Sequence, residues 1–495
     1  MKKNIFYGIK VAVFTVTALL VVTLVNRIEN PKYFYNNSWP TTATYTGFYK
    51  MPKDSVDVLF FGSSHAASGF NPQELYDRYG ITSYNLGCEQ QNLLVSYYWL
   101  KEALDYQKPK VVVVDTYMLQ WYNGNEPLNT AESCTRKAID YMRWGKAKVE
   151  AVHDIAKYDS NQSLWSYYLT NIRFHTRWSW LGSDDFADWE GRSHFETKGY
   201  APLNSFSGNT WYQPFSERST TEQSDLHPLM LEYMDKIVSL CEENGIQLLL
   251  VKNPTTATSV GLHNSIKAFA AERNLEFVDM NDISNYRKLG FHFSKDMADD
   301  GHPNVSGAMK ITDFVGKILV EQYGVTARQN TVWEETKQYY QELKDIFTFS
   351  QETDIVRYLK KLNSDRYSVF IAVKDEASNG LSQEVVDAMQ ELGLAFDLAD
   401  KYRYSYIAIK TEDEQYEELS TKQITRKGMF RKNKIAYNIT SSGYDCGNYA
   451  SINLGGTEYC ENQRGLNIVV YDNISQTIID SVCFDTFDAQ ITAIR

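Results

Sequence analysis

Short apolar runs alternate with segments of helical periodicity between residues 51 and 325. Mostly apolar runs predict buried strands at 57–61, 110–115 and 247–252, and further short strands are expected at 83–86 and 275–278. Apolar residues recurring every three or four positions predict helices, at 72–79, 92–106, 229–243, 266–272 and 305–323. Asn71 is placed to cap the first of these helices. The alternation predicts a three-layer α/β domain, in which a parallel sheet is covered by helices on both faces.

This alternation fails between about residues 120 and 225. The stretch contains seven of the ten tryptophans, and its densest aromatic segments are 165–169 and 177–181. We expect a helical insertion packed over the sheet. Its aromatic rings either form the insertion's own core or line a groove, since aromatic faces stack on sugar rings and other extended ligands.

A second pattern begins after a polar, helix-prone connector at 326–350. Residues 351–495 contain several short apolar runs and one helical segment, 382–392. The runs predict strands at 367–373, 404–410, 434–440, 466–471 and 477–483. About 140 residues is an ordinary domain size, so we expect a separate α/β, mostly-β domain here.

The N-terminus predicts a membrane anchor. Lys2, Lys3 and Lys10 precede fifteen uncharged residues, 11–25, and neighbouring apolar residues extend this run toward the roughly 20 that a spanning helix needs. A cleaved signal peptide is the alternative, but Val25-Asn26-Arg27 is a poor cleavage site. Residues 1–28 are therefore predicted to be a cytoplasmic tip and single transmembrane helix, and 29–50 a stalk. The basic end stays inside, which places the remaining chain outside the cell membrane.

Charge and cysteine content narrow the function. The formal net charge of −12 argues against a broad nucleic-acid surface, which needs clustered Lys and Arg. Six cysteines without a CxxC spacing make a zinc site improbable. A disulfide between Cys460 and either Cys446 or Cys483 remains open if the compartment is oxidising.

Two motifs at opposite ends of the 51–325 region suggest nucleophilic chemistry. Phe60-Phe61-Gly62-Ser63-Ser64-His65 follows a predicted strand, and Asp299-Asp300-Gly301-His302-Pro303-Asn304 precedes a predicted helix. An attacking hydroxyl must lose its proton, an imidazole can accept it, and a carboxylate can orient that imidazole. Isolated, the serine would equally suit a helix N-cap, and the histidine a surface loop.

Gly62-Ser63-Ser64-His65 together with Asp299-x-x-His302 resembles the SGNH (GDSL-like) hydrolase family. The resemblance implies a flavodoxin-like sheet, with Ser64 as nucleophile, His302 as base and Asp299 as its orienting acid. Asp300 is the alternative acid. Ser63 departs from the aspartate of the usual Gly-Asp-Ser block. The Phe-Gly-Ser-Ser-His motif at 61–65 is most similar to that of extracytoplasmic members that have one membrane anchor and work beside membrane-bound O-acyltransferases.

The same resemblance implies an oxyanion hole. Asn85-Leu86-Gly87 is similar to the family's second block, so the N–H groups of Gly87 and Ser64 are the expected donors. The third block, Gly-x-Asn-Asp, is missing from the sequence. Either Tyr117 or Asn253 replaces its asparagine, or the hole has only backbone donors. One such donor is worth roughly 3 kcal/mol, so its loss affects turnover more than reaction class.

The last domain resembles the interleukin-like EMT inducer domain. The resemblance is carried by the segments 462–470 and 480–486, and by 372–378 with 380–382 and 392–394. In the family the Arg-Gly-Leu-Asn block comes first, whereas here it comes last, which implies a circular permutation. Some relatives of this domain bind sugars, so it either holds a glycan or serves as a packing module.

These observations predict an extracytoplasmic serine esterase or O-acyl(acetyl)transferase that acts on an acylated surface glycan, without metal or other cofactor. A membrane-bound O-acyltransferase is an expected partner. The alternative is a non-catalytic glycan-binding or assembly protein on a hydrolase scaffold. A lipid esterase would need an apolar groove, and the polar run 88–92 argues against it.

Overall fold

The computed structural model describes residues 2–30, 41–122, 124–186, 197–216, 220–432, 434–473, 477–488 and 490–495. Residues 31–40 of the predicted stalk, and 187–196 and 217–219 of the predicted insertion, lie outside the described residues. The chain divides into two compact units, Met1–Gln341 and Glu342–Arg495. Each unit has its own hydrophobic core.

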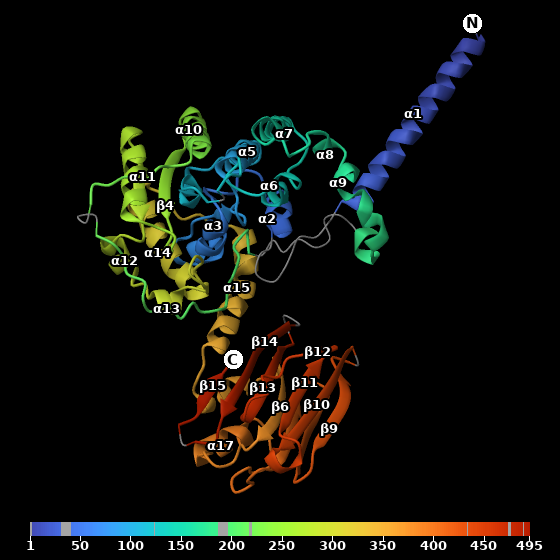
Figure 1. Cartoon of the computed structure of the whole chain (residues 1–495), viewed down its shortest axis with the longest axis vertical. Helices are drawn as coiled ribbons and strands as arrows, with labels where there is room; N and C mark the ends of the chain where they lie inside the picture. The colour runs from blue at the N-terminus through green and yellow to red at the C-terminus, as the bar shows by residue number, and fades with distance from the viewer. Residues whose placement is uncertain are drawn as a thin grey trace. The chain divides into compact units, whose positions relative to one another are not determined.

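The first unit is built on a parallel five-stranded sheet (Figure 1). Its strands are β1 (Val58–Phe61), β2 (Ser83–Asn85), β3 (Val111–Asp115), β4 (Gln247–Lys252) and β5 (Glu276–Asp279). They lie in the order β2-β1-β3-β4-β5, and Leu59 is in register with both Tyr84 and Val112. This order is that of flavodoxin-like doubly wound folds, in which ligands bind beyond the carboxyl ends of the strands. The predicted fold class is confirmed.

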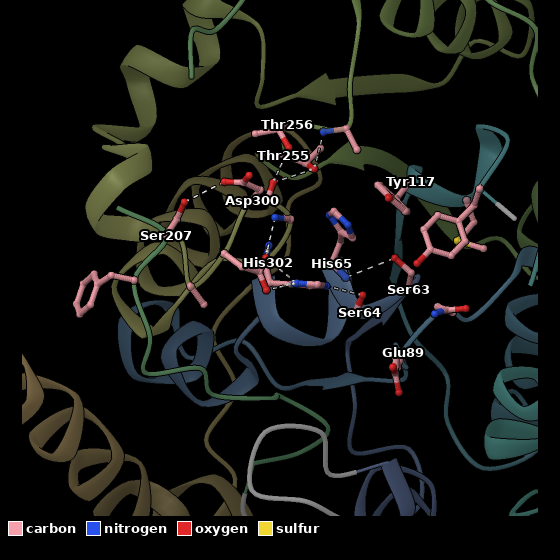
Figure 2. A pocket seen from close by; sticks show the side chains of 18 residues that line it. Ser63, Ser64, His65, Glu89, Tyr117, Ser207, Thr255, Thr256, Asp300 and His302 are labelled. Atoms are coloured by element: carbon pink, nitrogen blue, oxygen red, sulfur yellow. Dashed lines mark hydrogen bonds and ion pairs between the residues drawn. The ribbon is translucent and has the colours of Figure 1, made fainter. Parts of the chain in front are cut away.

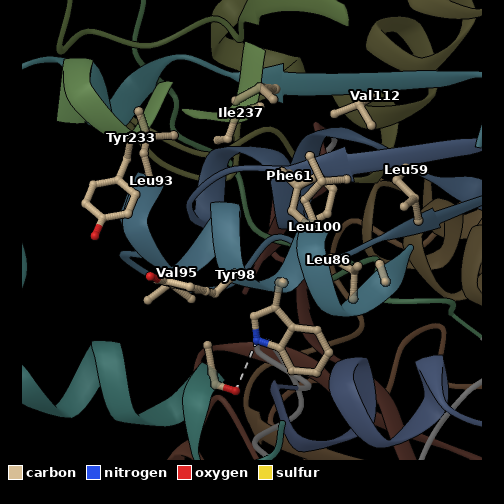
Figure 3. Close-up of a cluster of buried hydrophobic side chains, with 14 of the residues drawn as sticks. Leu59, Phe61, Leu86, Leu93, Val95, Tyr98, Leu100, Val112, Tyr233 and Ile237 are labelled. Atoms are coloured by element: carbon tan, nitrogen blue, oxygen red, sulfur yellow. Dashed lines mark hydrogen bonds between the residues drawn. The ribbon is translucent and has the colours of Figure 1, made fainter. Parts of the chain in front are cut away.

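Side chains that alternate along each strand enter two separate cores. Leu59 and Phe61 belong to one core, and Val58 and Phe60 to the other. Figure 3 shows the first core, where side chains of β1 and β3 meet residues of α5 (Leu93–Ala103) and α10 (Pro228–Glu243). Burial on both faces explains why β1 and residues 111–114 of β3 are apolar without interruption.

Helices cover both faces of this sheet. The core with Leu59 includes α5, α10 and α11 (Val260–Glu272), while the other core includes α3 (Ser64–Gly69), α4 (Pro72–Tyr79) and α14 (Val305–Glu321). Shorter helices are α2 (Thr41–Phe48), α12 (Ile283–Leu289), α13 (Phe293–Asp296) and the 3-10 turn η1 (Tyr117–Leu119). Asparagine side chains cap several helices; the predicted cap at Asn71 is confirmed, because its side chain accepts from the N–H groups of Gln73 and Glu74.

The insertion is helical, as predicted, but the tryptophans that the structure describes there do not form its core. α6 (Glu132–Ile139) and α7 (Lys146–Tyr158) pack against α5. Beyond them lie α8 (Trp165–Tyr168), α9 (Asn171–Phe174), η2 (His175–Trp180) and η3 (Ser183–Phe186). Trp165, Trp178 and Trp180 are exposed. The core interpretation is therefore wrong for these rings, because the short helices that carry them bury few side chains.

A single long apolar helix, α1 (Lys2–Glu29), begins the described chain (Figure 1). Its segment Ile5–Glu29 is long and apolar enough to cross a membrane, and its apolar surface is not covered by other described parts of the chain. The helix that the anchor prediction requires is thus present. Which side of a membrane the remaining chain faces stays a prediction.

The second unit is mostly β. It contains β6 (Tyr367–Asp375), β7 (Ser405–Lys410), β8 (Gln415–Ser420), β9 (Ile424–Phe430), β10 (Ile435–Gly443), β11 (Tyr449–Leu454), β12 (Thr457–Glu458), β13 (Gly465–Asp472), β14 (Thr477–Asp485) and β15 (Thr492–Ile494). Two helices, α16 (Ile355–Leu362) and α17 (Gln383–Glu391), cover one core, and the turn η4 (Tyr444–Cys446) follows β10. The long helix α15 (Thr331–Ser350) runs across the boundary between the two units, which falls after Gln341.

The segments that carry the resemblance of the second unit meet in space. β6 and β13 pair antiparallel, so that Val373 lies opposite Leu466. Arg464 forms an ion pair with Asp485 at 2.8 Å, and the Thr486 hydroxyl donates to the Ala377 carbonyl at 2.9 Å. All six cysteines are free thiols, so the disulfide that the sequence left open is not formed in this structure.

Candidate active site

Ser64 stands at a sharp turn between β1 and α3. Gly62 makes this turn with φ of +145°, and a Cβ atom added there would lie 2.8 Å from the Asp115 Cβ. Ser63 caps α3, and Ser64 is its first residue. The Ser64 N–H therefore belongs to a helix N-terminus, where backbone donors are left without intrahelical partners.

His302 and Asp299 come from one loop, between α13 and α14. His302 Nε2 lies 2.8 Å from Ser64 Oγ, and His302 Nδ1 lies 2.9 Å from each carboxylate oxygen of Asp299 (Figure 2). An ionised carboxylate only accepts hydrogen bonds, so Nδ1 carries the proton and Nε2 is left to accept one from the serine hydroxyl. The structure thus brings together three of the predicted residues in the order that base-assisted attack requires.

The loop is fixed by backbone hydrogen bonds. The Ala298 N–H donates to the His302 carbonyl at 2.7 Å, and the Asn304 N–H donates to the Asp296 carbonyl at 3.0 Å. Asn304 then caps α14, with its side chain accepting from the Gly307 N–H at 3.1 Å. The helix cap and the loop closure together hold the imidazole toward Ser64.

Asp299 is held in its charged form. Partial burial alone would raise the pKa of this carboxyl, but hydrogen bonds from the His302 ring and from the N–H groups of Gly301 and His302 lower the pKa to about 2. The carboxylate is therefore negative at every physiological pH. A negative charge beside Nδ1 favours the imidazolium that forms when His302 takes a proton.

A hollow of about 770 Å³ opens above these residues at the carboxyl end of the sheet. Figure 2 shows Ser64, His65 and His302 at its floor, with Tyr117 and the two threonines Thr255 and Thr256 on its walls. The remaining lining combines polar residues, among them Ser63, Glu89, Gln90, Ser207 and Asp300, with apolar ones such as Met118 and Phe206. The hollow can accept a bulky polar substrate.

The two predicted backbone donors of the oxyanion hole differ in whether their N–H groups already have a hydrogen-bond partner. The Ser64 N–H makes no hydrogen bond within the described residues. The Gly87 N–H, in contrast, donates to the side-chain oxygen of Asn85 at 2.9 Å. Asn85 is itself held by bonds from its amide to the carbonyls of Ala66 and Phe70, both at 2.8 Å. Gly87 can serve an oxyanion only by sharing or exchanging its present partner.

The two candidates for a third donor differ in position. Tyr117 lines the hollow, with its ring stacked on that of His65 at a centroid distance of 3.8 Å. Asn253 does not line it, since its side-chain amide donates to the His65 carbonyl at 2.8 Å. Of the two, only Tyr117 is positioned to reach a bound substrate.

His65 lies beside His302 in the hollow, with 5.2 Å between the ring centroids. Burial lowers the pKa of His65 well below its usual range, and the neighbouring His302 and Lys252 lower it further. The ring is therefore neutral at physiological pH. Its Nδ1 has no hydrogen-bond partner within the described residues.

The hollow also contains the alternative acid and two threonines that no sequence motif singles out. Asp300, the alternative acid, points away from His302 and accepts hydrogen bonds from Ser207 at 3.0 Å and Asn209 at 2.9 Å. Thr255 and Thr256 come from the loop after β4, where only the end of a predicted strand marks them. That position, at the carboxyl edge of a parallel sheet, is the one general clue that could have found them.

Comparison with known proteins gives two matches. The family model of the interleukin-like EMT inducer matches residues 332–414, which lie at the start of the C-terminal region. Among solved structures, a Bacteroides fragilis protein provisionally described as an acylhydrolase is 13% identical, with a TM-score of 0.26. That match covers 57% of this chain and 95% of the other. No curated protein matches.

Proposed function

We propose that this chain is a serine-dependent acyl-transfer enzyme of the SGNH type, in which Ser64, His302 and Asp299 act as nucleophile, base and orienting acid. The observation that carries the proposal is the continuous hydrogen-bonded chain from Ser64 Oγ through the His302 ring to Asp299. A helix cap or a surface histidine would not need this arrangement.

The reaction follows from these positions. Ser64 Oγ attacks the carbonyl carbon of an ester while its proton passes to His302 Nε2. The negative oxygen of the tetrahedral intermediate is stabilised by the Ser64 N–H, with Gly87 and Tyr117 as further donors. His302 then gives the proton to the departing alcohol, which leaves an acyl group on Ser64. Water or a sugar hydroxyl attacks this acyl-enzyme in the same way, and its proton returns through His302.

An acylated cell-surface glycan is the substrate class we favour. The hollow is open, and hydroxyl, amide and carboxylate groups that can bind sugar hydroxyls share its lining with aromatic rings, such as that of Tyr117, on which a sugar ring can stack. The apolar α1 provides a membrane anchor for an enzyme working at the cell surface. Esterase and O-acyltransferase activities share every step except the final acceptor, and a membrane-bound O-acyltransferase is the partner that we propose for the transfer reaction.

A fluorophosphonate probe tests the serine chemistry, because it reacts covalently only with an activated hydroxyl. We expect the full chain to be labelled in membranes, and Ser64→Ala to abolish labelling. Ser239→Ala is the matched control, since that serine lies exposed on α10 and should leave labelling unchanged. Equal labelling of wild type and Ser64→Ala would refute the assignment of the nucleophile.

A non-catalytic glycan-binding protein on the same scaffold is the second candidate. This candidate is favoured by the hydrogen bond from the Gly87 N–H to Asn85. Of the two predicted backbone donors, only the Ser64 N–H is then uncommitted within the described residues. This candidate predicts no probe labelling of the wild-type chain, together with retained binding of the glycan.

A further inference from the structure

The helical insertion carries an exposed apolar face, defined here as residues 165–186. Trp178 and Trp180 are 70% and 84% exposed, and Trp165 and Phe186 are each 65% exposed. Leu169 and Ile172, from the same segment, are also exposed. Single exposed apolar residues are common, but so many large ones within one short segment indicate a surface that is covered in the working protein.

This exposed apolar face adjoins the C-terminal end of α1. The Asn171 N–H donates to the side-chain oxygen of Asn26 at 3.1 Å, and Arg177 donates to the Glu29 carbonyl at 2.8 Å. Figure 1 shows α9 beside the end of α1 that is remote from the N-terminus. Asn26 and Glu29 directly follow the last apolar residues of α1, so the face lies at the level where that helix would leave a bilayer.

A hollow of about 550 Å³ opens at the same junction. It is lined by Arg27 and Asn30 from the end of α1 and by Arg143 and Trp144 from the loop before α7. Trp144 stacks on Tyr168 with centroids 4.8 Å apart. Exposed cations beside tryptophan and tyrosine rings are the combination found at the headgroup level of membranes.

We propose that residues 165–186 form a second membrane contact, with Trp165, Trp178 and Trp180 inserted into the headgroup region of the same bilayer that α1 spans. A lipid surface fits better than a protein partner because the exposed apolar surface of α1 needs the same medium, and the face continues from it. Tryptophan suits this depth, since its apolar body faces the acyl chains while its N–H reaches water or headgroups. The inference does not depend on the proposed enzyme activity.

Fluorescence quenching by lipids tests this contact. The full chain is reconstituted in phosphatidylcholine vesicles whose acyl chains carry bromine near the headgroup, and tryptophan emission is compared with that in unbrominated vesicles. We expect the triple variant Trp165→Phe/Trp178→Phe/Trp180→Phe to lose most of the lipid-quenched emission. Trp211→Phe is the matched control, because Trp211 is 68% exposed but lies outside the face, and it should lose none.

Iodide, a quencher confined to water, distinguishes the remaining outcomes. If the three tryptophans lie in the headgroup region, the iodide-quenched emission is nearly the same in wild type and triple variant. Lipid-quenched emission that survives in the triple variant overturns the proposal. Shielding of these rings from both iodide and brominated lipid would also overturn it, since a second copy of the chain would then cover the face.

Discussion

At the scale of single residues, the charge states around Ser64 are fixed by hydrogen bonding and burial. Hydrogen bonds keep Asp299 ionised, with a pKa of about 2, while burial keeps His65 neutral. Two groups that lie close to the same hydroxyl are thereby removed from titration at physiological pH. In the proposed mechanism, His302 is the group that exchanges a proton with Ser64 Oγ.

Substituting Asp299→Asn tests the orienting role. An amide can donate to Nδ1 and so favour the wrong tautomer of His302, and we expect kcat to fall roughly 10²–10⁴-fold. Asp300→Asn should cost less than about tenfold, because that carboxylate bonds to Ser207 and Asn209 rather than to His302. Ester hydrolysis by the two variants provides the measurement, and equal losses would contradict the assignment.

The pH dependence of Asp299 has a definite sign. Its pKa is lowered from 3.8 to about 2 by folding, so its contribution to stability is present above pH 4 and is lost as the pH falls toward 2. No step of the rate profile between pH 4 and 9 should therefore come from this carboxyl.

How far the site can be predicted also differs from residue to residue. Ser64, Asp299 and His302 lie in short motifs, so their types and spacing are visible in the sequence alone. The hydrogen bond from the Gly87 N–H to the Asn85 side chain cannot be predicted from the sequence, because the orientation of that side-chain amide depends on tertiary neighbours such as Ala66 and Phe70. A backbone donor named from a motif can already be occupied.

At the scale of elements, the turn between β1 and α3 determines where the nucleophile points. We expect Gly62→Ala to destabilise the protein by at least about 1–3 kcal/mol, because φ of +145° is strained for alanine and the new Cβ would collide with Asp115 and Ala66. Denaturant unfolding measures this cost, and probe labelling of Ser64 should slow in parallel.

Gly290→Ala is the matched control for this turn. Gly290 also has a positive φ, +61°, but its Cβ would meet open space. Backbone strain alone then predicts a loss of about 1 kcal/mol. Equal destabilisation by the two alanines would show that the packing around Gly62 does not matter.

The sequence predicts elements well where burial is two-sided. All five strands of the parallel sheet are predicted, and the signal is strongest in β1, β3 and β4, where both faces are covered and most residues are apolar. In the second unit, the apolar pattern does not predict β8, β9 or β11. β8 has the sequence QYEELS and buries none of its residues fully, so it carries no continuous apolar signal. The exposed tryptophans show the opposite error, since an aromatic-rich segment suggests buried rings, whereas Trp165, Trp178 and Trp180 are exposed.

At the scale of the whole molecule, separate cores predict separate unfolding. Trp99 is fully buried in the first unit, and Phe484 is fully buried in the second. Trp99→Ala and Phe484→Ala each remove several kcal/mol, which corresponds to a lowering of Tm on the order of 10 °C. We expect calorimetry of the full chain in detergent to show two transitions, with each variant lowering only its own. A single transition lowered by both variants would contradict independent units.

The placement of His302 and Asp299 on one short loop has a consequence for how activity can be lost. In hydrolases that take acid and base from distant segments, a change that displaces one need not displace the other. Here the loop is held by the backbone hydrogen bonds of Ala298 and Asn304. Loss of either bond should therefore displace His302 and Asp299 together. Damage to this loop should therefore lower the proposed activity by at least as much as Asp299→Asn does, because His302 and Asp299 are displaced at once while the rest of the first unit stays folded.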